Sequence, residues 1–184
     1  MIRLALWLLG GLLLGGIAHL ATVLLLPDLA TQDAYSRLSP ITPVNAVRAV
    51  PPPTPDKAVL PFMDPAFVMS VCRYDLANGP LNLTVPVSHA YTSVSFYTRN
   101  DVAYYAINDR AAGRRVIELD LMTPEQRGGL PGDEEITAAD RLIVESPTET
   151  GLIVIKALAP EPGLIPSVQK ALTATRCQVQ PATE

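Results

Sequence analysis

The densest group of chemically capable side chains in this 184-residue chain follows a predicted aromatic strand. Asn108, Asp109 and Arg110 come directly after Tyr104 and Tyr105, so an amide, a carboxylate and a guanidinium are neighbours in sequence. Such side chains can contact a polar ligand, and we take Tyr105, Asn108, Asp109 and Arg110 as candidate ligand-binding residues. The alternative is a tight turn that these side chains stabilise through hydrogen bonds to the backbone.

His89 is the single histidine outside the long apolar segment at the start of the chain. Any Ser–His or Cys–His arrangement would have to use it, so we keep it as a further candidate ligand contact and general base. The competing interpretation is an ordinary surface histidine near Pro86. No nucleophile-elbow pattern surrounds the nearby serines, and Gly128-Gly129 lacks the lysine of a phosphate-binding loop. Without a catalytic motif, the sequence leans against an enzyme and leaves the question open.

The two cysteines, Cys72 and Cys177, both follow the apolar segment. An exported domain folds in an oxidising compartment, where an even number of cysteines favours a disulfide; two buried free thiols are the alternative. A disulfide here would close a long loop and stabilise the domain by a few kcal/mol. Structural zinc sites need four ligands, mostly Cys and His. With two of each in the whole chain, we expect no metal, and we expect no cofactor either.

The apolar segment runs from Leu4 to Leu26 without an Asp, Glu, Lys or Arg. A bilayer core about 30 Å thick needs roughly 20 apolar residues in a helix, so the sequence predicts a transmembrane anchor over residues 1–27. The alternative is a cleaved signal peptide, which has a shorter apolar core and small residues before the cleavage site. The best cleavage position, after Ala30, has Asp28 where a small residue is needed, so we expect the anchor to be retained.

The flanks and the interior of the anchor add two expectations. Arg3 precedes the span, whereas Asp28 and Asp33 follow it; this favours a cytoplasmic amino terminus with the rest of the chain outside. Gly11 and Gly15 form a GxxxG pattern, which lets two membrane helices approach closely. They are candidate helix-association residues, although glycine is also simply common in membrane helices.

The chain after the anchor divides into two parts by composition. Residues 28–62 form a juxtamembrane segment and then a proline-rich stretch, and because proline fixes φ and lacks the amide donor we expect an extended linker there. Residues 63–184 are long enough for one domain. The net charge of the chain is −4, with acidic and basic residues interspersed. This argues against nucleic acid as a partner, because that affinity depends on clustered Lys and Arg.

The part after residue 62 is predicted to be mainly β. Short alternating segments are separated by turn signals such as Asn78-Gly79 and Asn100-Asp101, and the latter predicts a hairpin. Thr123-Pro124-Glu125-Gln126 has the pattern of a helix start with a capping box, and Leu164–Cys177 has apolar residues at helical spacing. We expect an antiparallel β-sandwich or open barrel with a C-terminal helix. The predicted strands cover residues 66–76, 81–85, 91–99, 102–107, 115–121, 141–145 and 149–159.

Several motifs resemble an uncharacterised bacterial family of predicted inner-membrane proteins with a β-rich domain of unknown function. They are Asp64-Pro65-Ala66-Phe67, Cys72-Arg73-Tyr74-Asp75-Leu76, Asn78-Gly79-Pro80-Leu81, Val85-Pro86, Tyr105–Arg110, Thr123–Gln126 and Cys177. The segment Tyr74–Pro86 is also similar to the amino-terminal half of larger two-domain exported bacterial proteins. The resemblance implies a single-pass protein of the bacterial inner membrane with a periplasmic domain, encoded beside a small partner that carries the other half. It implies no activity or catalytic residue.

Two functions from different classes remain. The first is a non-catalytic structural or interaction component of the envelope, with the lipid bilayer and a companion small membrane protein, or a second copy of the chain, as partners. The second is an enzyme or ligand-binding domain for a small envelope or lipid-derived molecule, which would use His89 and the Tyr105–Arg110 region.

Overall fold

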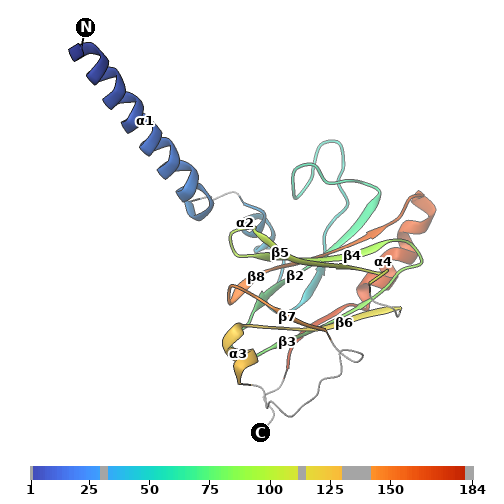
Figure 1. Ribbon diagram of the computed structural model, residues 1–184. Coiled ribbons are helices and arrows are strands. Elements are labelled where there is room, and N and C mark those ends of the chain that lie inside the picture. The colour runs from blue at the N-terminus through green and yellow to red at the C-terminus, as the bar shows by residue number, and fades with distance from the viewer. Residues whose placement is uncertain (1, 30–32, 112–114, 130–141, 181–184) are drawn as a thin grey trace. The chain divides into compact units, whose positions relative to one another are not determined.

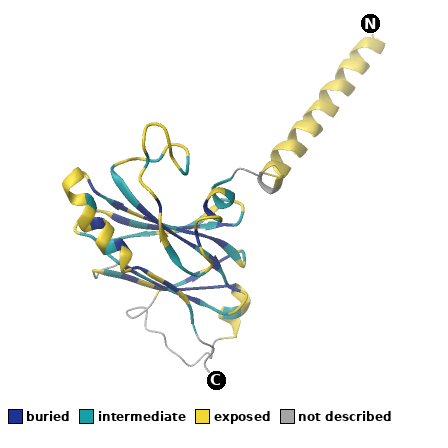
Figure 2. Ribbon diagram, turned by 180° about the vertical axis from the view of Figure 1, so that it is seen from behind, coloured by how far each residue is buried: buried dark blue, intermediate teal, exposed yellow. Residues whose placement is uncertain are grey.

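The structure is a computed structural model that describes residues 2–29, 33–111, 115–129 and 142–180 (Figure 1). The chain divides into two compact units, Met1–Asp33 and Ala34–Glu184. The first unit is one helix, α1 (Ile2–Leu29). Its part Ile2–Leu26, with 25 residues, is long and apolar enough to cross a membrane, features that an N-terminal signal sequence shares. None of its most apolar stretch is buried within the chain (Figure 2).

The second unit contains two β-sheets, as expected for a mainly-β antiparallel domain. The order of strands in the first is β1-β2-β8-β4-β5, all antiparallel, and in the second β7-β6-β3-β9, where the pair β6–β7 is parallel. The first sheet comprises β1 (Val47–Ala49), β2 (Phe67–Asp75), β8 (Thr150–Leu158), β4 (Thr92–Thr98) and β5 (Ala103–Asn108). The second comprises β7 (Leu142–Glu145), β6 (Val116–Met122), β3 (Leu81–Pro86) and β9 (Arg176–Val179).

The main core lies between the two sheets. Strands β3 and β4 alternate strictly between buried and half-buried residues, because successive side chains of a strand point to opposite faces. Leu83 and Leu119 from one sheet and Phe96 and Ile153 from the other are fully buried in the same cluster. The apolar residues of the alternating pattern therefore form the inward face of each sheet, and the two inward faces pack together as in a sandwich.

One disulfide joins the two sheets through this core. Cys72 on β2 is bonded to Cys177 on β9, with 6.5 Å between their Cα atoms, and both residues are buried. The bond spans 105 residues of sequence. The structure thus contains the disulfide that the even cysteine count favours, and it connects the carboxy-terminal strand to the opposite sheet.

A second apolar cluster lies on the outer face of the five-stranded sheet. Leu38 of the short helix α2 (Ala34–Leu38) and Val50 pack there with Met69, Val71 and Leu152. The compact unit consequently begins at Ala34, earlier than the start near residue 63 that the proline content suggests. Proline excludes regular helix and central strand but permits an extended covering segment and a short edge strand, and β1 is such an edge strand.

The carboxy-terminal helix is shorter than expected. The helical spacing predicts a helix over Leu164–Cys177, but α4 covers only Ile165–Thr173, after the 3₁₀ turn η1 (Pro162–Leu164). Strand β9 follows and pairs with β3, which the sequence does not indicate. The prediction is wrong there because pairing with β3 places Cys177 in the core, a tertiary gain that exceeds the weak local preference of a few residues for helix.

Two local predictions are confirmed in detail. Strands β4 and β5 form an antiparallel hairpin, and its turn residue Asp101 has a φ of 60°. Helix α3 (Pro124–Gly128) begins with a complete capping box, in which the Thr123 hydroxyl accepts from the Gln126 amide and the Gln126 side chain accepts from the Thr123 amide.

Candidate ligand pocket beside His89

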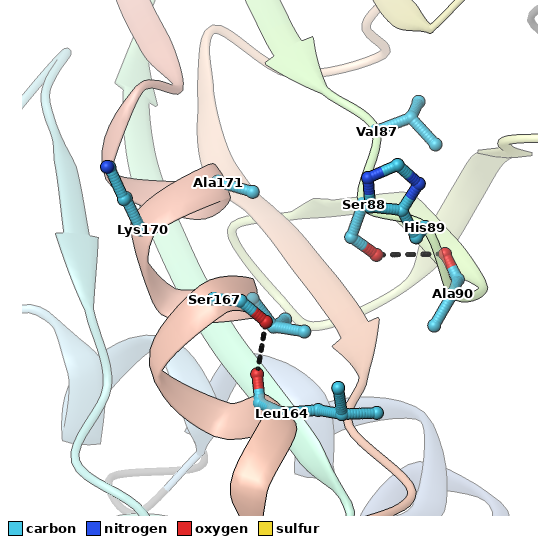
Figure 3. A pocket seen from close by; sticks show the side chains of 9 residues that line it. Val87, Ser88, His89, Ala90, Leu164, Ser167, Lys170 and Ala171 are labelled. Atoms are coloured by element: carbon cyan, nitrogen blue, oxygen red, sulfur yellow. Dashed lines mark hydrogen bonds between the residues drawn. The ribbon is translucent and has the colours of Figure 1, made fainter.

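A pocket of about 480 Å³ lies between helix α4 and the loop that joins β3 to β4 (Figure 3). The loop contributes Val87, Ser88, His89 and Ala90. The helix and the turn before it contribute Leu164, Ser167, Val168, Lys170 and Ala171. These helix positions recur at intervals of three or four residues, so α4 presents one face to the loop. Such a cleft has the size of sites that hold small molecules.

The two serine hydroxyls of this pocket are already engaged by backbone carbonyls. Ser88 Oγ donates to the Ala90 carbonyl oxygen at 2.9 Å, and Ser167 Oγ donates to the Leu164 carbonyl oxygen at 2.8 Å (Figure 3). A serine nucleophile instead needs a base within hydrogen-bonding reach of its hydroxyl. Among the described hydrogen bonds, neither hydroxyl donates to His89.

The walls of the pocket are apolar and its polar groups are separated. Val87, Leu164 and Ala171 line it with aliphatic atoms, whereas the amine of Lys170 points away from His89 (Figure 3). Apolar walls with one imidazole suit a small molecule that has an apolar body and one hydrogen-bonding group.

The other sequence candidates do not line this pocket. The ring of Tyr105 packs against the ring of Phe96 in the core, with 5.8 Å between the two ring centroids. Asn108 Oδ1 accepts hydrogen bonds from the amides of Arg110 and Ala111, at 3.1 and 3.2 Å, so this side chain stabilises a turn. Arg110 itself is exposed. A ligand-binding role for these residues stays a prediction.

Asp109 is connected to the pocket loop indirectly. Its Oδ1 accepts from the Thr92 amide at 3.4 Å, and its own amide donates to the Thr92 carbonyl oxygen at 2.9 Å. The Thr92 hydroxyl in turn accepts from the Ser88 amide at 3.3 Å. This chain of bonds fixes the loop that carries His89, so Asp109 is a positioning residue for that loop.

Sequence reasoning missed the contribution of helix α4 to this pocket. The helical spacing of Leu164, Val168 and Ala171 is visible in the sequence, but it indicates only that one face is buried. Which loop covers that face depends on the packing of both sheets, and no local pattern encodes it. Lys170 carries no motif and could not be singled out.

A separate pair of hydrogen-bonded tyrosines lies inside the domain, where Tyr74 is buried and Tyr104 is half-buried. Tyr104 Oη donates to Tyr74 Oη at 3.2 Å, and Tyr74 Oη lies 3.0 Å from Ser146 Oγ. Burial raises the pKa of Tyr104 well above its ordinary value, and the neighbouring Tyr74 raises it further. The phenol of Tyr104 therefore stays protonated at neutral pH and serves as a hydrogen-bond donor inside the fold. Within the described ranges, no group of three or more His, Cys, Asp or Glu side chains could hold a metal ion.

Comparisons with known proteins extend over the β-rich part of the chain. The model of a family described as "Protein of unknown function (DUF1254)" matches residues 44–179. The crystal structure of the VPA0106 protein from Vibrio parahaemolyticus is similar, with a TM-score of 0.59 and 12% identity over 79% of this chain and 34% of that chain. An uncharacterised protein from Burkholderia cenocepacia has a TM-score of 0.47 and 15% identity over 85% of this chain and 38% of that chain.

This chain therefore spans little more than a third of the length of these two solved proteins. No curated protein gives a significant match. At 12% identity, the likeness to VPA0106 shows a shared fold and nothing about activity.

Proposed function

The chain belongs to the DUF1254 family of proteins of unknown function, and from that premise we propose that it is a single-pass protein of the bacterial inner membrane which acts as an interaction component of the envelope. The amino terminus lies in the cytoplasm, and the β-rich domain lies in the periplasm. A companion membrane protein binds the anchor and the domain. The chain performs no chemistry of its own in this account.

The observation that carries the proposal is the uncovered helix α1. Ile2–Leu26 contains 25 residues and no buried position in its most apolar stretch. An apolar helix of this length is stable only when lipid or another helix covers it. The disulfide between Cys72 and Cys177 supports an oxidising compartment for the domain.

The glycine face of α1 supports a helix partner. A Cβ atom added at Gly11 or Gly15, which share one face of the helix, would meet no heavy atom within 4 Å among the described residues beyond the neighbouring helix backbone. The backbone is therefore accessible along this face, where a second helix can pack closely. This chain covers 34% of VPA0106, which supports the idea that a domain of this fold functions together with additional protein domains.

The double variant Gly11→Leu with Gly15→Leu tests the helix contact. A Cβ atom at either position meets nothing within 4 Å among the described residues, but the leucine side chain would keep a partner backbone away, so the partner that co-purifies in mild detergent should be lost. The matched control is Leu13→Phe with Ile17→Phe, which adds bulk at the same i, i+4 spacing on the opposite face of the helix. If the partner stays bound to the glycine variant, the anchor does not form the contact.

A second candidate function rests on the pocket beside His89, which suits a small envelope or lipid-derived molecule with an apolar body. Ala171→Phe would fill this pocket from helix α4, and Asp109→Ala would release the loop that carries His89. A ligand that raises the melting temperature of the wild-type chain should raise it less in both variants. A broad metabolite panel without any shift in the wild-type chain would count against this function.

A further inference from the structure

Two adjoining pockets open on the outer face of the five-stranded sheet. Their volumes are about 340 Å³ and 220 Å³, and they share three lining residues, Leu60, Met69 and Lys156. The larger pocket lies beside the segment 60–64, and the smaller one lies beside α2, whose Leu38 lines it. We call the two pockets together the outer trough.

The strand register places the floor of the outer trough on one face of the sheet. Lys156 on β8 pairs with Met69 on β2 and with Ser93 on β4. Directly paired residues point to the same face, so these three side chains form one row across the sheet. Val154 and Leu152 follow on the same face of β8 at intervals of two residues, and both belong to the outer apolar cluster. Lys156 therefore projects from the same face as the apolar floor.

The amine of Lys156 has no counter-ion in the part of the chain that the structure describes. It forms no ion pair or hydrogen bond there, and Lys156 is exposed. The two acidic residues that line the outer trough each accept a hydrogen bond from a nearby backbone amide: Asp64 from Ala66 at 2.9 Å and Asp101 from Ala34 at 2.8 Å. A positive charge beside apolar walls attracts an anionic group.

The smaller pocket is lined mainly by apolar side chains. Leu38 and Leu152 are buried in the outer cluster, and Val154 and the ring of Tyr97 pack against them. Lys156 and Leu152 are four positions apart on β8, which corresponds to about 13 Å along the strand. The apolar chain of a ligand whose charged group lies at Lys156 can extend over this floor toward Leu152.

Aromatic side chains are exposed at the rim of the larger pocket. Phe62 is fully exposed and has a φ of 57°, a value that is rare for a bulky residue, and Tyr91 is 40% exposed. Large apolar side chains that stay in water beside a pocket are stabilised when apolar surface of a ligand covers them. An amphiphilic ligand with its charged group at Lys156 would lie beside this rim.

We infer that the outer trough binds a fatty acid, whose carboxylate pairs with Lys156 and whose chain lies along β8 in the smaller pocket. The single compact charge of a lysine matches one carboxylate, whereas phosphate groups are typically held by the planar forks of arginine. The inference does not depend on the proposed envelope function. It also differs from the second candidate function, since the outer trough shares no lining residue with the pocket beside His89.

The test uses the full chain in nanodiscs of phosphatidylcholine, with a dodecanoate that carries a photoreactive diazirine near the end of its chain. After illumination, mass spectrometry of proteolytic peptides locates the attached probe. Probe dissolved in the bilayer labels α1, and this labelling is the internal reference for the amount of probe present. We expect a second group of labelled residues in the outer trough, among them Leu38, Tyr97 and Leu152.

Two competitors separate the contributions of charge and chain. Excess unlabelled dodecanoate should reduce the labelling of the outer trough relative to that of α1. Dodecanol has the same chain without a charge and should reduce it far less, and butyrate, which has the charge without a long chain, should leave it unchanged. Equal effects of dodecanoate and dodecanol would overturn the inference that Lys156 binds the carboxylate.

Four variants make the test specific. Lys156→Gln should lower the labelling of the outer trough relative to α1 by about threefold or more, because the charge pair is lost, and Lys156→Arg should retain most of it. The matched control Arg115→Gln removes one positive charge just before β6 of the other sheet and should leave the labelling unchanged. Val154→Phe fills the smaller pocket without a change of charge and should also lower the labelling, while thermal melting checks that the variant is folded. Labelling that is confined to α1, or that is undiminished in Lys156→Gln, would overturn the inference.

Discussion

The phenol of Tyr74 lies over Gly151, its direct partner across strands β2 and β8. A Cβ atom added to Gly151 would collide with the Tyr74 side chain and with the Tyr97 carbonyl oxygen of β4. The absence of a side chain on Gly151 lets Tyr74 cross the strand, and Tyr74 Oη donates to the Tyr97 carbonyl oxygen at 3.2 Å. Tyrosine thus fills the space that a glycine leaves in a central strand.

The first prediction follows from this contact. Gly151→Ala should destabilise the domain by about 1–3 kcal/mol or more, because the methyl group overfills a packed core and displaces the buried Tyr74. Urea unfolding of the full chain in detergent measures the loss. Gly163→Ala is the matched control, since a Cβ atom there meets nothing within 4 Å. Equal stability of the two variants would show that Tyr74 does not occupy the space beside Gly151.

The second prediction concerns alkaline pH. Burial, and then the neighbouring Tyr74, raise the pKa of Tyr104 above its ordinary value of 10.0. The unfolded chain loses this proton near pH 10 while the folded domain retains it, so Tyr104 contributes stability below pH 10 that is lost as the pH rises further. The loss is about 1.4 kcal/mol per pH unit for this single group.

Tyr104→Phe isolates that contribution. The variant should be less stable than wild type at pH 8 by about 1 kcal/mol, because the hydrogen bond to Tyr74 Oη is lost. The difference between the two proteins should shrink and then reverse between pH 10 and 11, because above pH 10 the unfolded wild-type chain loses the Tyr104 proton that the folded domain retains. A difference that stays constant over this range would contradict the raised pKa.

The third prediction concerns the disulfide. Replacing Cys72 and Cys177 with serine should lower the free energy of unfolding by about 4 kcal/mol, because the bond closes a loop of 105 residues and limits the unfolded chain. Non-reducing mass spectrometry of the wild-type chain should show a mass two hydrogens below that of the reduced form. Two alkylatable thiols in the folded wild-type protein would contradict the bond between the sheets.

The fourth prediction concerns the segment before β1. Leu38 is fully buried against the outer face of the five-stranded sheet, so Leu38→Ala should cost about 2–5 kcal/mol. Ile41→Ala, three residues later and 37% exposed, should cost much less. Urea unfolding of the two variants distinguishes a covering segment from a free linker, in which both changes would stay within about 0.5 kcal/mol.

The sequence predicts the parts of the fold that depend on interactions between residues close together in the chain. The Asn100-Asp101 turn, the Thr123 capping box and the alternation of β3 and β4 each depend on residues within one short stretch. Strands β1 and β9 are not predicted from the sequence, because each pairs with a strand, β2 or β3, from which many residues of the chain separate it. A strand of three or four residues is defined by its neighbour more than by its own residues.

The candidate site was predictable only in part, for the same reason. His89 was found from its residue type, and the structure places it in a pocket. For Asn108 the sequence indicates a turn more strongly than a ligand contact, and the hydrogen bonds of its side chain to the backbone stabilise the turn.

The central claim is that a retained anchor joins this domain to a companion membrane protein, and native mass spectrometry of the complex extracted from membranes in mild detergent tests it most directly. The account predicts the chain at its full mass of 19.7 kDa, with residues 1–27 present, bound in fixed stoichiometry to a smaller membrane polypeptide. A chain that lacks its first 27 residues, or one found alone, would contradict the claim.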